Sequence, residues 1–208
     1  SDIGARLVVV VDIDFEQFDS EFSEPAWGDG NFLAAVLNRK MDSVQLKHFK
    51  QQIDYEKFSI PACSSIYGIE LLDDNVLSAR LRLNEIFNSH YSKNFDELNE
   101  SVIKSVKKIF ELNIVQGDAL SFKCGKKLDK PIVLPEWSLI DNSLKRRDFA
   151  YKDFISYAPI DGPNLFSDLG EKAFLPEPIK DWPLTKYYKI YEFKRWEPRY
   201  FKFPCEFK

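Results

Sequence analysis

The chain has 208 residues, 44% of them hydrophobic and 30% charged, so it is long enough to bury one sizeable core and too short for two full domains. Its formal net charge of −4 argues against a general attraction to nucleic acid or to an anionic membrane, so such contacts need a local patch. No apolar run approaches the roughly 20 residues of a membrane span, and Cys63, Cys124 and Cys205 show no CxxC spacing, which together indicate a reduced, cytoplasmic protein with no membrane contact.

The first informative stretch is FSEPAWGDGNF, residues 22–32, which places Gly28 and Gly30 one residue apart. Such a turn usually leads from a strand into a helix and lets the backbone approach a ligand at the start of that helix. The apolar residues that follow, from Phe32 to Met41, recur at helical spacing and predict that helix. Residues 42–59 extend it or form a second amphipathic helix.

The next unit reads as a strand, an acid and a helix. Ile66, Tyr67 and Ile69 form a short apolar run that ends at Glu70 and predicts a buried strand. Asp73, Asp74 and Asn75 have the chemistry of a helix N-cap, and the apolar spacing after them predicts a helix through Phe87.

A second unit of the same kind follows. The spacing of apolar residues from Leu98 to Phe110 predicts a helix, and Ile114 and Val115 predict a strand that ends at Gly117–Asp118. A fourth apolar run, Ile132–Leu134, predicts a strand that stops at Pro135. Strands that alternate with helices in this way favour parallel βαβ units.

We therefore expect an α/β fold with a doubly wound, mostly parallel, Rossmann-like sheet that carries helices on both faces. Residues 1–140 would form its core. Residues 141–208, rich in Pro and aromatic residues, would form an irregular C-terminal extension of short edge strands packed on that core.

Three polar signals follow predicted strands: the glycine turn after Glu24, the acid Glu70, and Asp118. In an open α/β sheet, ligands bind at the carboxyl ends of the strands, where all three signals would lie. Glu70 can accept hydrogen bonds from two ribose hydroxyls, and Asp118 can accept one from an adenine amine. Taken singly, each signal has a plainer reading as a loop, a helix cap or a turn.

At these residues the chain resembles the adenine-specific DNA methyltransferases. SEPAWGDGNFL is similar to their first motif, (D/E)PACG(S/T/N)GxFL, while SIYGIELLDDNVLSARLRL resembles the second and NIVQGDAL the third. The resemblance covers roughly residues 5–140 and is closest to methyltransferase subunits of bacterial restriction-modification systems. It implies a Rossmann-like sheet of seven strands that binds S-adenosylmethionine.

The resemblance also implies a set of cofactor-binding residues, which are Glu24, Ala26, Gly28 and Gly30 around the methionine part, Glu70 and Leu71 at the ribose and adenine, and Asp118 and Ala119 at the adenine. The implied function is transfer of a methyl group to the N6 atom of adenine in DNA. DNA is then the expected partner through local contacts, and a partner subunit would supply target recognition because only 68 residues follow Ile140 (208 − 140).

The catalytic motif of that family, (D/N/S)PP(Y/F), is represented here by Leu134-Pro135-Glu136-Trp137. The candidate catalytic residues are Pro135, Glu136 and Trp137. Leu134 cannot accept a hydrogen bond from the target amine, so Glu136 would have to do so, while Trp137 could stack on an extruded base. The alternative is a strand that ends in a turn, with Trp137 in the core.

The departure from the motif leaves two other functions open: a non-catalytic subunit or DNA-binding module with the methyltransferase fold, and a small-molecule methyltransferase. The basic triplet Lys145, Arg146 and Arg147 contacts phosphates or forms a solvated charge cluster. The C-terminal aromatic residues either stack on bases beside neighbouring basic residues or pack inward from edge strands, and we favour inward packing; they include Tyr187, Tyr188, Tyr191, Trp196 and Tyr200. His48 and His90 lack companions at metal-ligand spacing and are expected to be surface residues of helices.

Overall fold

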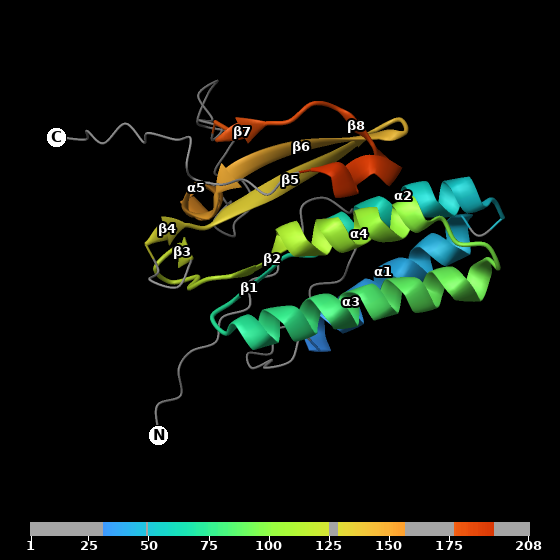
Figure 1. Ribbon diagram of the computed structural model, residues 1–208, viewed down its shortest axis with the longest axis horizontal. Helices are drawn as coiled ribbons and strands as arrows, with labels where there is room; N and C mark the ends of the chain where they lie inside the picture. Colours follow the sequence, from blue (N-terminus) through green and yellow to red (C-terminus); the bar gives the residue numbers. More distant parts are fainter. Residues whose placement is uncertain (1–30, 49, 125–128, 157–176, 194–208) are drawn as a thin grey trace, which may run out of the picture.

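The computed structural model describes residues 31–48, 50–124, 129–156 and 177–193 (Figure 1). The helices, in chain order, are α1 (Asn31–His48), α2 (Gln52–Ser64), α3 (Asp73–Asn94), α4 (Glu100–Asn113), α5 (Tyr151–Ser156) and the 3₁₀ helix η1 (Tyr187–Glu192). The strands are β1 (Gly68–Glu70), β2 (Ile114–Gln116), β3 (Lys123–Cys124), β4 (Lys130–Pro131), β5 (Val133–Ile140), β6 (Ser143–Ala150), β7 (Lys180–Asp181) and β8 (Thr185–Lys186).

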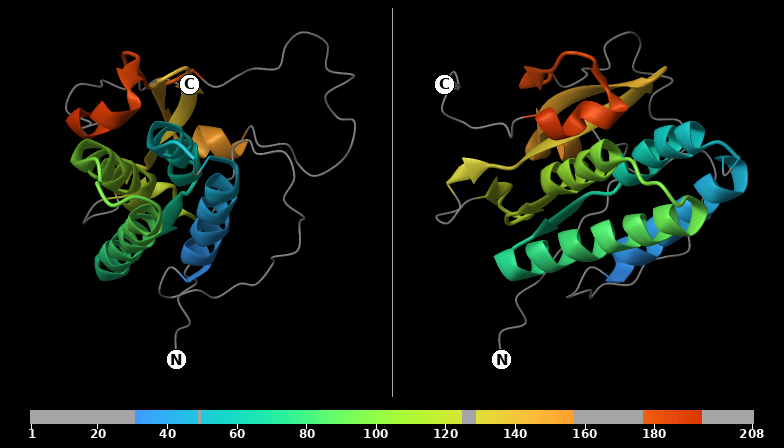
Figure 2. Two further views of the ribbon diagram at one scale, coloured as in Figure 1. Left: turned by 90° about the vertical axis from the view of Figure 1, so that its right-hand side faces the viewer. Right: turned by 45° about the vertical axis from the view of Figure 1, so that its right-hand side comes forward.

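The helices α2 and α4 lie between two other parts of the molecule. Helices α1 and α3 pack against them on one side, and the long hairpin β5–β6 packs on the other, together with η1. Figures 1 and 2 show this arrangement, with the hairpin and η1 grouped away from α1 and α3. The chain is therefore a mixed helix-and-strand fold with small sheets.

The predicted unit of strand, helices and strand is present. β1 and β2 pair in parallel, with Glu70 opposite Gln116, and the crossover between them runs through α3 and α4. The strands form because their residues are apolar and fully enclosed: Ile69, Ile114 and Val115 are all buried. Sequence periodicity therefore identified both strands and both crossover helices correctly.

The rest of the described sheet structure is antiparallel rather than parallel. β5 and β6 form an antiparallel hairpin, and β7 and β8 add to the far edge of β6. The expectation of a strand that stops at Pro135 is wrong, because β5 continues through Pro135 to Ile140. Proline lacks an N–H group and is tolerated in a strand whose edge is unpaired, and within the described residues β5 pairs only with β6.

The two-residue turn at Asp141 and Asn142 sets the register of this hairpin. Ile140 pairs with Ser143 across the turn, and Asp141 adopts a left-handed backbone with φ of 52°. Asp and Asn tolerate that conformation better than most residues. The expected boundary between the core, residues 1–140, and the C-terminal extension, residues 141–208, lies at this turn. Strands β5 and β6, which lie on either side of that boundary, are paired along their whole length.

One local expectation about a helix also changes. The residue at the N-cap of α3 is Leu72, whose side chain makes no capping bond, while Asp73 and Asp74 lie in the first turn. Acidic side chains in the first turn interact favourably with the positive end of the helix dipole, so Asp73 and Asp74 can stabilise α3 without capping it. By contrast, α4 is capped by Asn99, whose side chain accepts a hydrogen bond from the backbone N–H of Ser101.

Candidate functional site

The carboxyl ends of β1 and β2 form one edge. The parallel pairing ends with Glu70 beside Gln116, and the backbone N–H of Gly117 donates to the carbonyl of Glu70 at 2.9 Å. Asp118 is the next residue. The structure therefore brings Glu70 and Asp118 to the same edge of the same two strands, as the sequence pattern predicted.

Glu70 is buried, and its carboxylate is held by the backbone. Only 8% of the residue is exposed, and Oε1 accepts a hydrogen bond from the N–H of Leu72 at 3.1 Å. No second donor to this carboxylate is found among the described residues, so Oε2 retains its acceptor capacity there. Leu71 is exposed, and its carbonyl accepts from Nε2 of Gln116 at 3.0 Å.

Asp118 closes a tight turn. Its Oδ1 accepts from the N–H of Leu120 at 3.0 Å, and its backbone bridges to Lys123. A hydrogen bond from the hydroxyl of Ser121 is the main cause that lowers the pKa of the Asp118 carboxyl, and the N–H of Leu120 adds a smaller effect. The carboxyl is therefore ionised at neutral pH. Ala119 is buried in a small apolar cluster below this turn. The edge thus presents two acceptor carboxylates.

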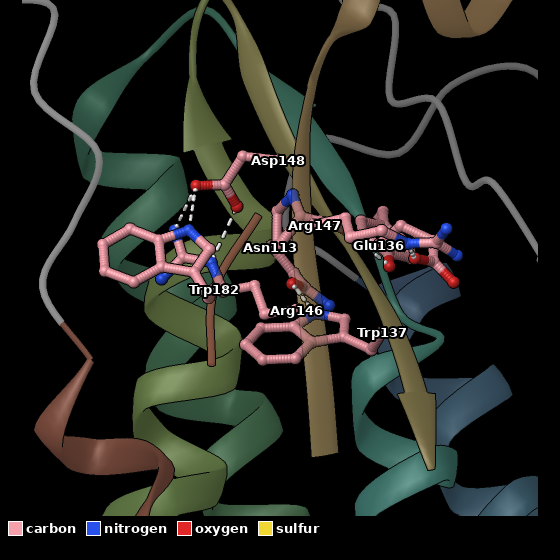
Figure 3. A network of polar contacts seen from close by, with 9 residues as sticks. Asn113, Glu136, Trp137, Arg146, Arg147, Asp148 and Trp182 are labelled. Atoms are coloured by element: carbon pink, nitrogen blue, oxygen red, sulfur yellow. Dashed lines mark hydrogen bonds and ion pairs between the residues drawn. The ribbon is translucent and has the colours of Figure 1, made fainter. Parts of the chain in front are cut away.

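The candidate catalytic residues Pro135, Glu136 and Trp137 lie inside β5 and are engaged in contacts within the chain. The carbonyl of Pro135 accepts from the hydroxyl of Tyr67 at 2.8 Å. Glu136 accepts from Nε of Arg147 at 2.8 Å and from the hydroxyl of Ser138 at 2.7 Å (Figure 3). Glu136 therefore has a cation and a hydroxyl as partners already.

Trp137 points to the opposite side of β5 from Glu136, toward the end of α4 (Figure 3). Its indole N–H donates to Oδ1 of Asn113 at 2.9 Å. Asn113 is fully buried, and its Nδ2 donates to the carbonyls of Ser64 and Ile66. One amide side chain therefore joins β5, the end of α4 and the segment that leads into β1.

The basic triplet is divided by the alternation of β6. Lys145 forms an ion pair with Asp181, and Arg147 forms one with Glu136, which raises the pKa of the Arg147 guanidinium. Arg146, on the other face, is 2% exposed and binds Asp148 through two nitrogens. All three cations therefore have carboxylate partners within the chain, but only Arg146 is buried, since the side chains of Lys145 and Arg147 are 29% and 43% exposed.

The contacts around Arg146 reach into the C-terminal segment. The indole N–H of Trp182 donates to Oδ2 of Asp148 at 2.7 Å, and the guanidinium of Arg146 lies 4.6 Å from the Trp182 ring centroid (Figure 3). The ring of Phe193 is 5.5 Å from the same guanidinium. Of the aromatic residues expected to pack inward from edge strands, Tyr187 is buried but Tyr191 is 40% exposed, and both lie in the 3₁₀ helix η1. Trp196 and Tyr200 lie outside the described residues. Trp182 and Phe193 also pack inward.

Four of the expected cofactor residues, Glu24, Ala26, Gly28 and Gly30, lie outside the described residues. Asn113 and the Arg146–Asp148 pair were missed by sequence reasoning. The i, i+2 spacing of Arg146 and Asp148 is a usable signal for the pair, since it places both side chains on one face of a strand. Nothing in the local sequence marks Asn113.

His90 is a further correction, because it is 7% exposed rather than a surface residue. Its Nε2 lies 3.0 Å from Oδ1 of Asn38, which connects α3 to α1. The described residues contain no cluster of three or more side chains suited to holding a metal ion. Within the same residues, no helix combines the length and apolar character required to cross a bilayer.

Comparison of the chain with protein-family models, with curated proteins and with solved structures finds no match. The functional argument therefore depends on the chain's own residues and on the motifs in its sequence.

Proposed function

We propose that the edge formed by Glu70 and Asp118 binds the adenosyl part of S-adenosylmethionine, and that the chain is the cofactor-binding part of a DNA adenine methyltransferase of a restriction-modification system. The observation that carries this proposal is the position of both carboxylates at the carboxyl ends of adjacent parallel strands. In the proposal, β1 and β2 belong to a doubly wound sheet.

The chemistry of the edge fits the adenosyl group. Oε2 of Glu70 offers acceptor capacity for ribose hydroxyls, because Oε1 alone is used by the backbone of Leu72. Leu71 is 44% exposed beside it and offers an apolar surface for a purine face. Asp118 supplies the second acceptor, suited to the exocyclic amine.

S-adenosylmethionine, when bound, supplies a methyl group on a sulfonium centre, and the neutral thioether left after transfer is a good leaving group. The part left to the protein is to hold donor and acceptor in line and to exclude water. In the described residues, that positioning role falls to Glu70 and Asp118. The motif residues Glu24, Ala26, Gly28 and Gly30 would hold the methionine part.

The first experiment measures cofactor binding alone. Calorimetry with S-adenosylhomocysteine, which carries no methyl group to transfer, is done on the full chain and on Glu70→Gln. We expect binding to weaken about tenfold or more in the variant, because an amide nitrogen replaces an acceptor. Glu85→Gln, a change of the same kind at an exposed position of α3, should bind as the unchanged protein does.

Absence of binding by the folded, unchanged chain at about 1 mM ligand would overturn the proposal. Equal weakening by Glu70→Gln and Glu85→Gln would remove the assignment to this edge. Circular dichroism of each variant separates a local effect from unfolding.

A second candidate function is a non-catalytic subunit with the same cofactor pocket, and one observation favours it. Glu136 and Trp137 are occupied by Arg147 and Asn113, so neither is available to a target base in this arrangement. If the chain does transfer methyl groups, we expect the acceptor for the target amine to come from a residue other than Glu136.

Transfer of a labelled methyl group to unmodified duplex DNA distinguishes these functions. Transfer that persists in Glu136→Gln supports a catalytic chain with a different acceptor. Loss of transfer in a Glu136→Gln protein that still binds S-adenosylhomocysteine would assign catalysis to Glu136. Binding of cofactor without any transfer supports the non-catalytic subunit, and addition of the partner subunit then tests whether activity needs both chains.

A further inference from the structure

A cavity of about 190 Å³ lies between α1 and α2. Six of the side chains that line it are Lys40, Val44, Lys47, His48, Phe58 and Ala62. None of these residues belongs to the edge of Glu70 and Asp118, and Figure 1 shows the C-terminal end of α1 on the opposite side of the view from the ends of β1 and β2. The cavity is therefore separate from the proposed cofactor edge.

The walls of the cavity are apolar and partly aromatic. Val44 and Ala62 are buried and present aliphatic surface. The imidazole of His48 stacks on the ring of Phe58, with centroids 3.8 Å apart and an interplanar angle of 13°. Because the two rings cover each other's facing sides, a flat ligand ring would pack against the edges of this pair.

The charges around the cavity have one sign. Lys40 and Lys47 line it, and Lys57 lies 5.5 Å from the centroid of the Phe58 ring. No Asp or Glu occurs among the described residues that line the cavity. An anionic group would therefore find complementary charge here, whereas a cation would be repelled.

The lysines have one simpler role, which accounts for only part of the pattern. Lys47 and His48 lie in the last turn of α1, where basic residues stabilise the negative end of the helix dipole. Lys40 lies two turns earlier, and it is only 7% exposed, with Nζ donating to the hydroxyl of Ser65 at 3.0 Å. The helix dipole acts at the last turn, so it does not account for the position of Lys40 on the wall of the cavity.

We propose that this cavity binds a small molecule that joins one planar apolar ring to one anionic group, either a carboxylate or a phosphate ester. The ring lies against His48 and Phe58, and the anion lies near Lys40 and Lys47. The volume supports a single ring, because pockets for drug-sized ligands start at about 300 Å³. This site is independent of the proposed cofactor edge.

The test is a ligand-observed NMR titration of the full chain with phenyl phosphate. We expect saturable binding with a Kd on the order of 1 mM, the affinity typical of a ligand of this size. Benzyl alcohol keeps the ring without the charge, and inorganic phosphate keeps the charge without the ring. Each of these two compounds should bind at least about tenfold more weakly than phenyl phosphate.

Two nearby lysines provide a matched pair of variants, Lys47 in the last turn of α1 and Lys50 in the turn that follows the helix. Lys47→Glu reverses a charge that lines the cavity, while Lys50→Glu reverses an exposed charge that does not line it. We expect Lys47→Glu to weaken phenyl phosphate binding about tenfold, and Lys50→Glu to change it less than about twofold. Ala62→Leu, which fills the cavity without changing charge, should also abolish binding and provides the test if Lys47→Glu fails to fold.

Several results would overturn the proposal. If binding of phenyl phosphate does not saturate up to about 10 mM, the proposed site does not exist. Equal binding of phenyl phosphate and inorganic phosphate means an adventitious ion only, and equal effects of Lys47→Glu and Lys50→Glu mean a general charge attraction. None of these results bears on the binding of S-adenosylmethionine, so the two proposals fail separately.

Discussion

The indole N–H of Trp137 donates to the fully buried Oδ1 of Asn113, and this bond connects the β5–β6 hairpin to the end of α4. Asn113 directly precedes β2, and Asp118 follows β2 by two residues. The contact therefore places the hairpin against the unit that carries the candidate site. It also gives Trp137 a structural role in a position where the sequence motif suggested base stacking.

Trp137→Phe should destabilise the fold, because it leaves Oδ1 of Asn113 buried without its donor. We expect a loss of about 1–3 kcal/mol in the free energy of unfolding, measured by urea denaturation. A double-mutant cycle with Asn113→Ala should give a coupling energy of about 0.5 kcal/mol or more. Simple additivity of the two single changes would contradict the bond.

Neighbouring arginines of β6 should lose very different amounts of stability on the same substitution. Arg146→Met leaves Asp148, which is fully buried, without its cation, and should cost about 3–5 kcal/mol. The side chain of Arg147 is 43% exposed, so Arg147→Met should cost about 1 kcal/mol or less. Thermal unfolding of both variants checks this, and similar losses in the two would mean that burial does not set the difference.

Gly117 should tolerate a methyl group less well than Gly68. A Cβ at Gly117 would lie 2.8 Å from Cδ1 of Ile132 and 3.0 Å from the backbone oxygen of Lys123, which cannot move freely. We expect Gly117→Ala to cost about 1–3 kcal/mol.

At Gly68 the nearest atoms would be ends of flexible side chains, Cδ1 of Leu33 at 3.1 Å and Cδ1 of Ile114 at 3.3 Å. Gly68→Ala should therefore cost less than Gly117→Ala in the same urea series. The reverse order would show that the turn after β2 is looser than the geometry indicates.

His90 should make the stability depend on pH. Burial is the main cause that lowers the pKa of His90 below its ordinary value of 6.5; Lys93 adds to this effect and Asp42 opposes it. The unfolded chain therefore binds more protons than the folded one as the pH falls below about 6.5. The contribution of His90 to the free energy of unfolding is therefore complete above that pH and is lost progressively as the pH falls below it.

Urea denaturation at pH 7.5 and at pH 5.5 measures this loss, and the unfolding free energy should be lower at pH 5.5. Asp42→Asn removes the opposing charge, so it should lower the pKa of His90 further and increase the difference between the two pH values. A smaller difference in Asp42→Asn would contradict this explanation. NMR titration of the His90 ring reports the pKa directly.

The sequence alone determined the helices and the strands of the β1–α3–α4–β2 unit, because their apolar residues recur with the period of each element. It also placed Glu70 and Asp118 at one edge, since carboxylates that follow successive parallel strands share that edge. The hairpin had a local signal as well. Trp137 and Leu139 alternate with Glu136 and Ser138, and Asp141–Asn142 can form a turn.

Only the tertiary structure decided which segments pair and which polar groups are buried. Pro135 lies within β5 rather than at its end, because an unpaired strand edge accepts a residue without an N–H group. The three adjacent cations of β6 received different surroundings because alternate side chains point to opposite faces, and one face packs on α4 and η1. Such partners come from segments far apart in the chain, which local periodicity does not encode.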